Sequence, residues 1–121
     1  MGRQSALKQD NHQKVRAVID AVRGLELSET AAWSDLDALS SQTTVDGIEV
    51  DPEGVIFEDE NRFRGIANVY VALRYGSGSD SFETSDGFLG TFRGHIKKNG
   101  APVVEEFTVD TTPFFAGEKP A

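Results

Sequence analysis

The stretch RFRGIANVYVALRY, residues 62–75, decides the fold because its side chains alternate between two faces. One face carries apolar residues: Phe63, Ala67, Val69, Val71, Leu73 and Tyr75. The other carries polar ones: Arg62, Arg64, Asn68 and Arg74. A repeat of two residues is that of a β-strand with one side against a core. We therefore predict one long, half-buried strand at the centre of a sheet.

A second strand follows a flexible connection at residues 76–80. Its apolar and small side chains again share one face: Phe88, Gly90, Phe92, Gly94 and Ile96. The dipeptide Asn99-Gly100 then predicts a two-residue type I′ turn, because both central residues of that turn need a positive φ. A third strand, up to Asp110, completes a β-hairpin.

The register of this hairpin follows from its turn. If Lys98 lies opposite Ala101, apolar residues meet on one face, with Phe92 opposite Phe107. The same register places Ile96 opposite Val103, Gly90 opposite Val109, and Arg93 opposite Glu106. Glu105 alone falls on the apolar face, opposite Gly94, which predicts an edge position or a β-bulge.

Before residue 62 the pattern predicts another hairpin. Asp51-Pro52-Glu53-Gly54 suits a type I turn, and short apolar runs lie on either side of it, ending at Val50 and beginning at Val55. At the other end of the chain, Phe114 and Phe115 require a docking place, most simply beside the sheet.

Two helices are predicted at the N-terminus. The first has its apolar residues at helical spacing and stops at Gly24; they are Leu7, Val15, Val18, Ile19 and Val22. In the second, Ser28 is a suitable N-cap and Glu29 suits the first turn. Its apolar stripe is Ala32, Trp33, Leu36 and Leu39. The order of elements predicts a single α+β domain over residues 1–121, with helices at about 5–40, a sheet at about 44–110 and a tail at 111–121.

In this fold two helices pack on one face of a roughly five-stranded antiparallel sheet. The alternative is a sheet curled around a helix, as in cystatin-like and nuclear-transport-factor-like folds. The chain has 121 residues, enough for one core without disulfides or metals.

The composition of the chain excludes several classes of functional site. The chain has no cysteine, which excludes disulfides, thiolate metal sites and cysteine nucleophiles. No apolar run is long enough to span a bilayer, so we expect a cytoplasmic protein without a membrane partner. The net charge of −8 disfavours direct binding to nucleic-acid phosphates. Eleven acids and no Lys or Arg lie between Glu26 and Glu60.

No motif for catalysis, nucleotide binding or metal binding is present, and we predict no cofactor and no metal. Whether the chain is an enzyme stays open, with the pattern favouring a non-catalytic role. A small pocket between helices and sheet would be lined by Trp33, Tyr70, Tyr75, His95 and Asp110. An interaction surface would use the acids around the predicted turn: Asp51, Glu53, Glu58, Asp59 and Glu60.

The segment ANVYVALRYGSGSD, residues 67–80, with Phe88 and a strand near Phe92, resembles part of a known family. It is similar to the β-rich C-terminal segment of bacterial predicted nucleases associated with prokaryotic PIWI systems. The resemblance implies a stand-alone relative of an accessory module in bacterial defence or conflict systems. It carries over no catalytic residue, because the Glu-x-Lys triplet of restriction-type nucleases is absent here.

Three functions remain open. The first is a non-catalytic module that binds another protein or a second copy of itself, through the exposed sheet face or the acidic surface. The second is a small ligand-binding or enzymatic pocket within a curled α+β fold. The third is an acidic nucleic-acid mimic, whose carboxylates occupy a basic groove on a DNA-binding protein.

Overall fold

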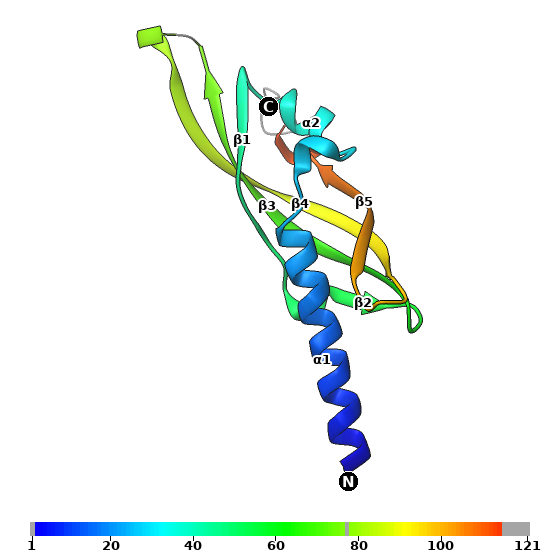
Figure 1. Cartoon of the computed structure of the whole chain (residues 1–121). Helices are drawn as coiled ribbons and strands as arrows, with labels where there is room; N and C mark the ends of the chain where they lie inside the picture. Colours follow the sequence, from blue (N-terminus) through cyan, green and yellow to red (C-terminus); the bar gives the residue numbers. More distant parts are fainter. Residues whose placement is uncertain (1, 77, 115–121) are drawn as a thin grey trace.

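The computed structural model describes residues 2–76 and 78–114 and has an α+β architecture (Figure 1). Its helical part comes first and consists of α1 (Gly2–Arg23), the 3₁₀ turn η1 (Leu27–Glu29) and α2 (Trp33–Asp37). The strands are β1 (Gln42–Glu49), β2 (Val55–Phe57), β3 (Arg62–Tyr75), β4 (Phe82–Ile96) and β5 (Pro102–Asp110). Two further 3₁₀ turns are η2 (Pro52–Gly54) and η3 (Gly78–Asp80). The predicted fold class is confirmed.

The sheet is antiparallel and has the order β1-β3-β4-β5, with β2 also paired to β3. The strand predicted at residues 62–75 is confirmed to the residue as β3. β3 and β4 form a long hairpin whose pairing runs without a shift from Arg62 opposite His95 to Tyr75 opposite Phe82. β4 is longer than predicted, because six exposed residues precede its apolar part.

The hairpin predicted around residues 51–54 is wrong. The turn itself forms, since the Gly54 N–H donates to the Asp51 carbonyl oxygen at 2.8 Å. However, β1 and β2 do not pair with each other: Glu49 lies opposite Asn68 and Val55 lies opposite Gly65, both on β3. β3 is long enough for both short strands to pair along one edge, so the chain continues past the turn instead of reversing.

The turn between β4 and β5 is where predicted but of another type. Gly100 has a φ of 88°, whereas no described non-glycine residue, Asn99 included, has a positive φ. The Lys97 N–H donates to the Ala101 carbonyl oxygen at 2.9 Å, so three residues form the loop instead of two. This geometry is the common three-residue hairpin loop with glycine in the left-handed region.

The extra loop residue shifts the predicted register by one near the turn, so Ile96 lies opposite Pro102 and not Val103. A β-bulge at Glu105, which the sequence indicated, shifts it back. Beyond the bulge the predicted pairs Arg93–Glu106, Phe92–Phe107 and Gly90–Val109 are confirmed.

The bulge requires glycine at position 94. A Cβ at Gly94 would collide with the Val103 carbonyl oxygen and lie 2.7 Å from the Phe63 ring. A similar close approach occurs at Gly65, where a Cβ would lie 2.5 Å from the ring of Phe92. Glycines thus let aromatic rings lie flat across neighbouring strands.

The first helix is confirmed as α1, but the second is shorter than predicted. α2 has five residues, and its N-cap is Ala32, without a side-chain cap. Ser28 lies inside η1 instead of capping a helix. The irregular turns of this segment still bury Leu27, Ala32, Leu36 and Leu39, so contacts with the core outweigh local helix preference here.

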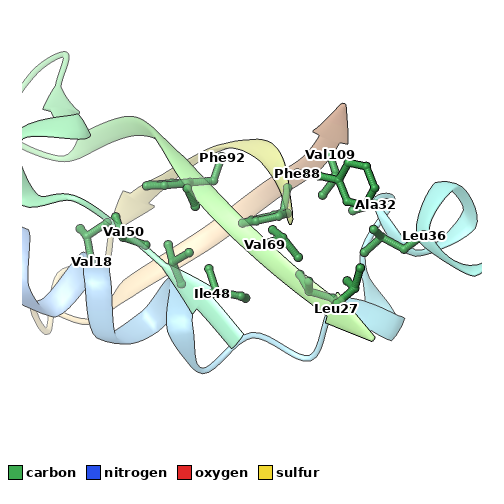
Figure 2. Packing of buried hydrophobic residues seen from close by; sticks show 14 of the residues in the cluster. Val18, Leu27, Ala32, Leu36, Ile48, Val50, Val69, Phe88, Phe92 and Val109 are labelled. Atoms are coloured by element: carbon green, nitrogen blue, oxygen red, sulfur yellow. The ribbon is translucent and has the colours of Figure 1, made fainter. Parts of the chain in front are cut away.

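The core lies between the helical part and one face of the sheet, which we call the inner face. Val18 and Val22 of α1 are fully buried, each stabilising the fold by about 1.5–3 kcal/mol. Figure 2 shows Val18 beside Val50, and Leu27 and Ala32 near Val69 and Phe88. α1 contacts both outer strands, β1 and β5, which fits a curled sheet. Phe114 docks edge-on against Phe88, as predicted, whereas Phe115 lies outside the described residues.

Candidate functional site

The opposite face of the sheet, the outer face, carries exposed apolar side chains. Ile56 is 45% exposed, Ile66 48%, Tyr70 43% and Leu89 50%. They come from three neighbouring strands, β2, β3 and β4. We call these four residues the outer-face patch. Scattered apolar residues are normal on a surface, but a contiguous group marks a candidate binding surface.

The register makes the patch contiguous. Ile56 lies opposite Arg64, which places it diagonal to Ile66. Leu89 lies opposite Asn68, between Ile66 and Tyr70 along β3. Diagonal neighbours of this kind lie about 7–8 Å apart, within reach of long side chains.

A hollow of about 450 Å³ opens at the β2 end of the patch. The turn η2 forms one wall, and Gly54 lies so near Ile66 that a Cβ there would be 3.1 Å from that side chain. The lining of the hollow combines apolar Ile56 and Ile66 with four charged residues: Glu53, Arg64, Arg93 and Glu106. It can therefore accept an apolar side chain with a polar group beside it.

Charges around the hollow are unevenly matched. Arg93 donates to Glu106 Oε2 at 3.0 Å, and this hydrogen bond raises the pKa of the Arg93 guanidinium. Arg64 lies directly opposite Arg93 in the ladder, and no carboxylate within the described ranges pairs with Arg64. Two like charges placed opposite each other destabilise a sheet. This side of the hollow is therefore suited to an acidic group of a partner.

The predicted acidic surface lies at the two ends of β2. Asp51 and Glu53 belong to the turn before it, where the Asp51 side chain accepts from the Glu53 N–H at 2.9 Å. Glu58, Asp59 and Glu60 form the turn after it. All five residues are exposed. These five acids, which we call the acidic rim, therefore lie before and after Ile56 in the chain.

Asp59 organises the second of these turns. Its side chain accepts from the N–H of Asn61 at 2.8 Å and from the N–H of Arg62 at 2.9 Å, and it pairs with the Arg62 guanidinium at 3.1 Å. The hydrogen bond from Asn61, followed by that from the Arg62 side chain, lowers the pKa of Asp59. The Asp59 side chain thus stabilises the turn, whereas the charge of Glu58 acts on Arg93.

The five residues predicted to line a pocket do not come together. Tyr70, His95 and Asp110 lie on the outer face, on three different strands. Trp33 and Tyr75 pack against the core on the other side. The Tyr70 hydroxyl donates to Glu49 Oε1 at 3.4 Å, and His95 Nδ1 lies 2.7 Å from Glu105 Oε1.

A second hollow, of about 440 Å³, lies between η1 and β5. Glu26, Glu29, Glu105 and Glu106 contribute to its lining, so it is strongly acidic. Every buried side-chain nitrogen or oxygen of the described residues has a hydrogen-bond partner.

Sequence reasoning named the exposed sheet face as a binding surface but not the residues of the outer-face patch, although a signal was present. In residues 62–75, Ile66 and Tyr70 interrupt the polar face of an otherwise alternating strand. Apolar residues at positions where the period requires polar ones indicate a surface that meets something other than water.

Among the side chains described, those of residues 12–76 and 78–114, no group of three or more His, Asp or Glu is arranged to hold a metal ion. The described helices also include none that is both long and apolar enough to cross a membrane. Fold and surface together define a small α+β domain with an open sheet face. A family model, described as predicted pPIWI-associating nuclease, matches residues 4–115.

The chain belongs to this family of predicted pPIWI-associating nucleases, as the resemblance of residues 67–80 suggested. The match extends well beyond that segment and includes the helical part. No curated protein and no solved structure matches the chain.

Proposed function

We propose that this chain is a protein-interaction module of a bacterial, cytoplasmic pPIWI-associated defence system, and that its outer face binds another protein of that system. The observation that carries the proposal is the outer-face patch: Ile56, Ile66, Tyr70 and Leu89 are contiguous and each is 43–50% exposed. The family description supports a partner from a pPIWI system.

The chemistry around the patch favours a protein partner. Its centre is apolar, and its β2 end carries Arg64 and Arg93 beside the acidic rim. An apolar centre with a charged border is the usual arrangement of a protein–protein interface. A nucleic acid would instead need a predominantly basic surface, whereas this chain has a net charge of −8.

The direct test is co-purification of this chain with the pPIWI protein of the same system, followed by measurement of the dissociation constant. The double substitution Ile66→Asp and Leu89→Asp places two charges in the centre of the patch. We expect it to abolish binding, since both positions are half exposed and tolerate polar side chains in the free protein.

The matched control is Ala101→Asp, which adds the same side chain at an exposed position in the turn between β4 and β5. We expect the control to bind like the unmodified chain. Thermal unfolding of all three proteins would establish that they are equally folded. Equal affinity of the double variant and the unmodified chain would disprove the proposal.

Nuclease activity is the second candidate, because the family description names it. A magnesium-dependent nuclease needs carboxylates that converge on one point. The described side chains do not fit such a site, so we assign no metal-dependent step to them. The test is incubation of the chain with DNA and RNA, alone and with the pPIWI protein. Cleavage by the chain alone would replace the interaction module with an enzyme.

A further inference from the structure

The outer end of the β3–β4 hairpin leaves one strand edge open. β5 pairs with β4 only from Leu89 onward, so the first part of β4, Phe82–Gly87, has a strand on one side only. All six of these residues are exposed. We call Phe82–Gly87 of β4, together with the paired residues Tyr70–Tyr75 of β3, the arm. Figure 1 shows that the arm extends past the end of β5.

The direction of each backbone group along this edge follows from the ladder. The Ile96 N–H donates to the Asn61 carbonyl oxygen at 2.7 Å, so it points toward β3. Directions alternate along a strand, and the β3–β4 pairing has no shift. The N–H groups of Thr84 and Asp86 therefore also point toward β3, whereas those of Glu83, Ser85 and Gly87 point outward.

An independent contact supports this assignment. The Gly87 N–H donates to Oδ1 of the adjacent Asp86 at 2.8 Å. This bond is expected if the Gly87 N–H points outward, where no neighbouring strand accepts it. No hydrogen bond within the described part of the chain engages the outward amides of Glu83 and Ser85 outside the ladder. Open edges of this kind are templates for another strand.

Charge decides what kind of strand fits. Glu83 and Asp86 flank the open edge, and Glu83 is held only loosely, since its carboxylate lies 3.6 Å from the Arg74 guanidinium. A second copy of this chain would bring the same acids against them. A strand with Lys or Arg side chains would instead meet opposite charges across the ladder.

The tip of the arm adds an apolar contact. Phe82 is 59% exposed and stacks on Tyr75 with ring centroids 5.2 Å apart. An incoming strand would cover this ring with one of its own apolar side chains. The six-residue edge also matches the usual length of a strand, about five to six residues.

We propose that the edge of β4 at Phe82–Gly87 binds an extended, basic segment of a partner protein by β-strand addition. The main-chain groups of Glu83 and Ser85 form the hydrogen bonds, and Glu83 and Asp86 select Lys or Arg. This edge adjoins the outer-face patch at Gly87, which lies opposite Tyr70, but it binds through main-chain groups of Glu83 and Ser85, which are not part of the patch.

The experiment uses the whole chain, ¹⁵N-labelled, and a blocked hexapeptide of sequence Lys-Val-Lys-Val-Lys-Thr as the probe. We expect NMR shifts confined to the amides of residues 82–87 and stronger protection of the Glu83 and Ser85 amides from hydrogen exchange. The acidic peptide Glu-Val-Glu-Val-Glu-Thr should leave these amides unchanged. Shifts elsewhere, or none, would overturn the proposal.

Two variants of the chain sharpen the result. Ser85→Pro removes an outward N–H but no bond to β3, so it should abolish peptide binding. Asp86→Lys keeps the edge and reverses its charge, and it should weaken binding even if the proline variant folds poorly. The control, Ala101→Asp, adds a charge at an exposed position in the turn between β4 and β5 and should bind the peptide normally.

The oligomeric state tests the other occupant. Light scattering on the purified chain should give a monomer. A dimer that Ser85→Pro converts to a monomer would assign the edge to a second copy of the chain and overturn the proposal of a basic partner segment.

Discussion

The two ends of the β3–β4 hairpin belong to the same pair of strands but differ in their surroundings. At one end, Phe63 and Phe92 belong to strands that are paired on both sides, and both rings are almost fully buried. At the other end, Tyr75 and Phe82 stack on each other at the tip of the arm, and Phe82 is mostly exposed. In the body of the hairpin both strands are buried, whereas in the arm β3 still pairs with β1 and buries Val71 and Leu73, and only the β4 side is exposed. The arm is thus the part of the sheet left available for a partner.

The largest expected effect is a difference in unfolding free energy between alanine substitutions at the two ends of the hairpin. Phe63→Ala in the body removes a ring that is 1% exposed and should lower the free energy of unfolding by about 3–5 kcal/mol. Phe82→Ala at the tip of the arm should lower it by no more than about 1 kcal/mol. Denaturant unfolding of both variants measures the difference. Similar losses would mean that the arm is packed as tightly as the body.

The second effect concerns the close approach at the bulge. Gly94→Ala introduces a Cβ against the Val103 carbonyl and the Phe63 ring, which should lower the free energy of unfolding by about 1–3 kcal/mol. The matched control is Gly47→Ala in β1, where nothing lies within 4 Å of the new Cβ. We expect the control to change the free energy of unfolding by no more than about 0.5 kcal/mol. A neutral Gly94→Ala would show that the bulge relaxes freely.

The third effect concerns what anchors the arm on its β1 side. Thr43 lies opposite Leu73, and its buried hydroxyl donates to the Leu36 carbonyl oxygen at 2.9 Å and contacts the Ser40 hydroxyl at 2.9 Å. Thr43→Val removes both contacts and should lower the free energy of unfolding by about 1 kcal/mol.

Its control is Thr44→Val, the same change at the exposed neighbouring position. Hydrogen exchange of the β1 amides would reveal whether loosening is confined to the arm. Equal behaviour of the two variants would mean that the bond to α2 does not anchor the strand.

The smallest effect concerns Asp59, in the turn between β2 and β3. Hydrogen bonds from Asn61 and Arg62 lower the pKa of Asp59, so its ionised form stabilises this turn. A lowered pKa in the folded state means that this contribution is present above the ordinary aspartate pKa of about 3.9 and is lost as the pH falls through the lower folded value. An NMR titration should place the Asp59 midpoint below the ordinary aspartate value. A midpoint at the ordinary value would contradict the turn geometry.

Much of the fold was predictable because β3 alternates without interruption on its inner face. Shifting the register of this strand by one residue would turn Val69 and Val71 from the core to the outer face. The pair Phe92–Phe107 was predicted from a two-residue turn that does not form. It is correct because the extra residue of the loop and the β-bulge at Glu105 shift the register in opposite directions.

The errors have a different origin. The turn at residues 51–54 formed as predicted, but a turn does not specify which strand its neighbours pair with, and β3 was long enough to accept both. The short α2 reflects contacts of Leu36 and Leu39 with the rest of the core, which override local helix preference. The candidate pocket failed to come together because Tyr70 and Trp33 lie on opposite faces of the sheet. The outer-face patch was indicated by Ile66 and Tyr70 but became a surface only once the register was known.

Glu105 gives the β4–β5 hairpin one position at which its length can change. A chain without this residue would keep Val104 opposite Gly94 and Glu106 opposite Arg93, because Glu105 has no counterpart on β4. Loss of Thr108 would instead turn Val109 from the core to the outer face. We therefore expect insertions and deletions among relatives of this chain to fall at the bulge or in the loop around Gly100, and not between Glu106 and Asp110.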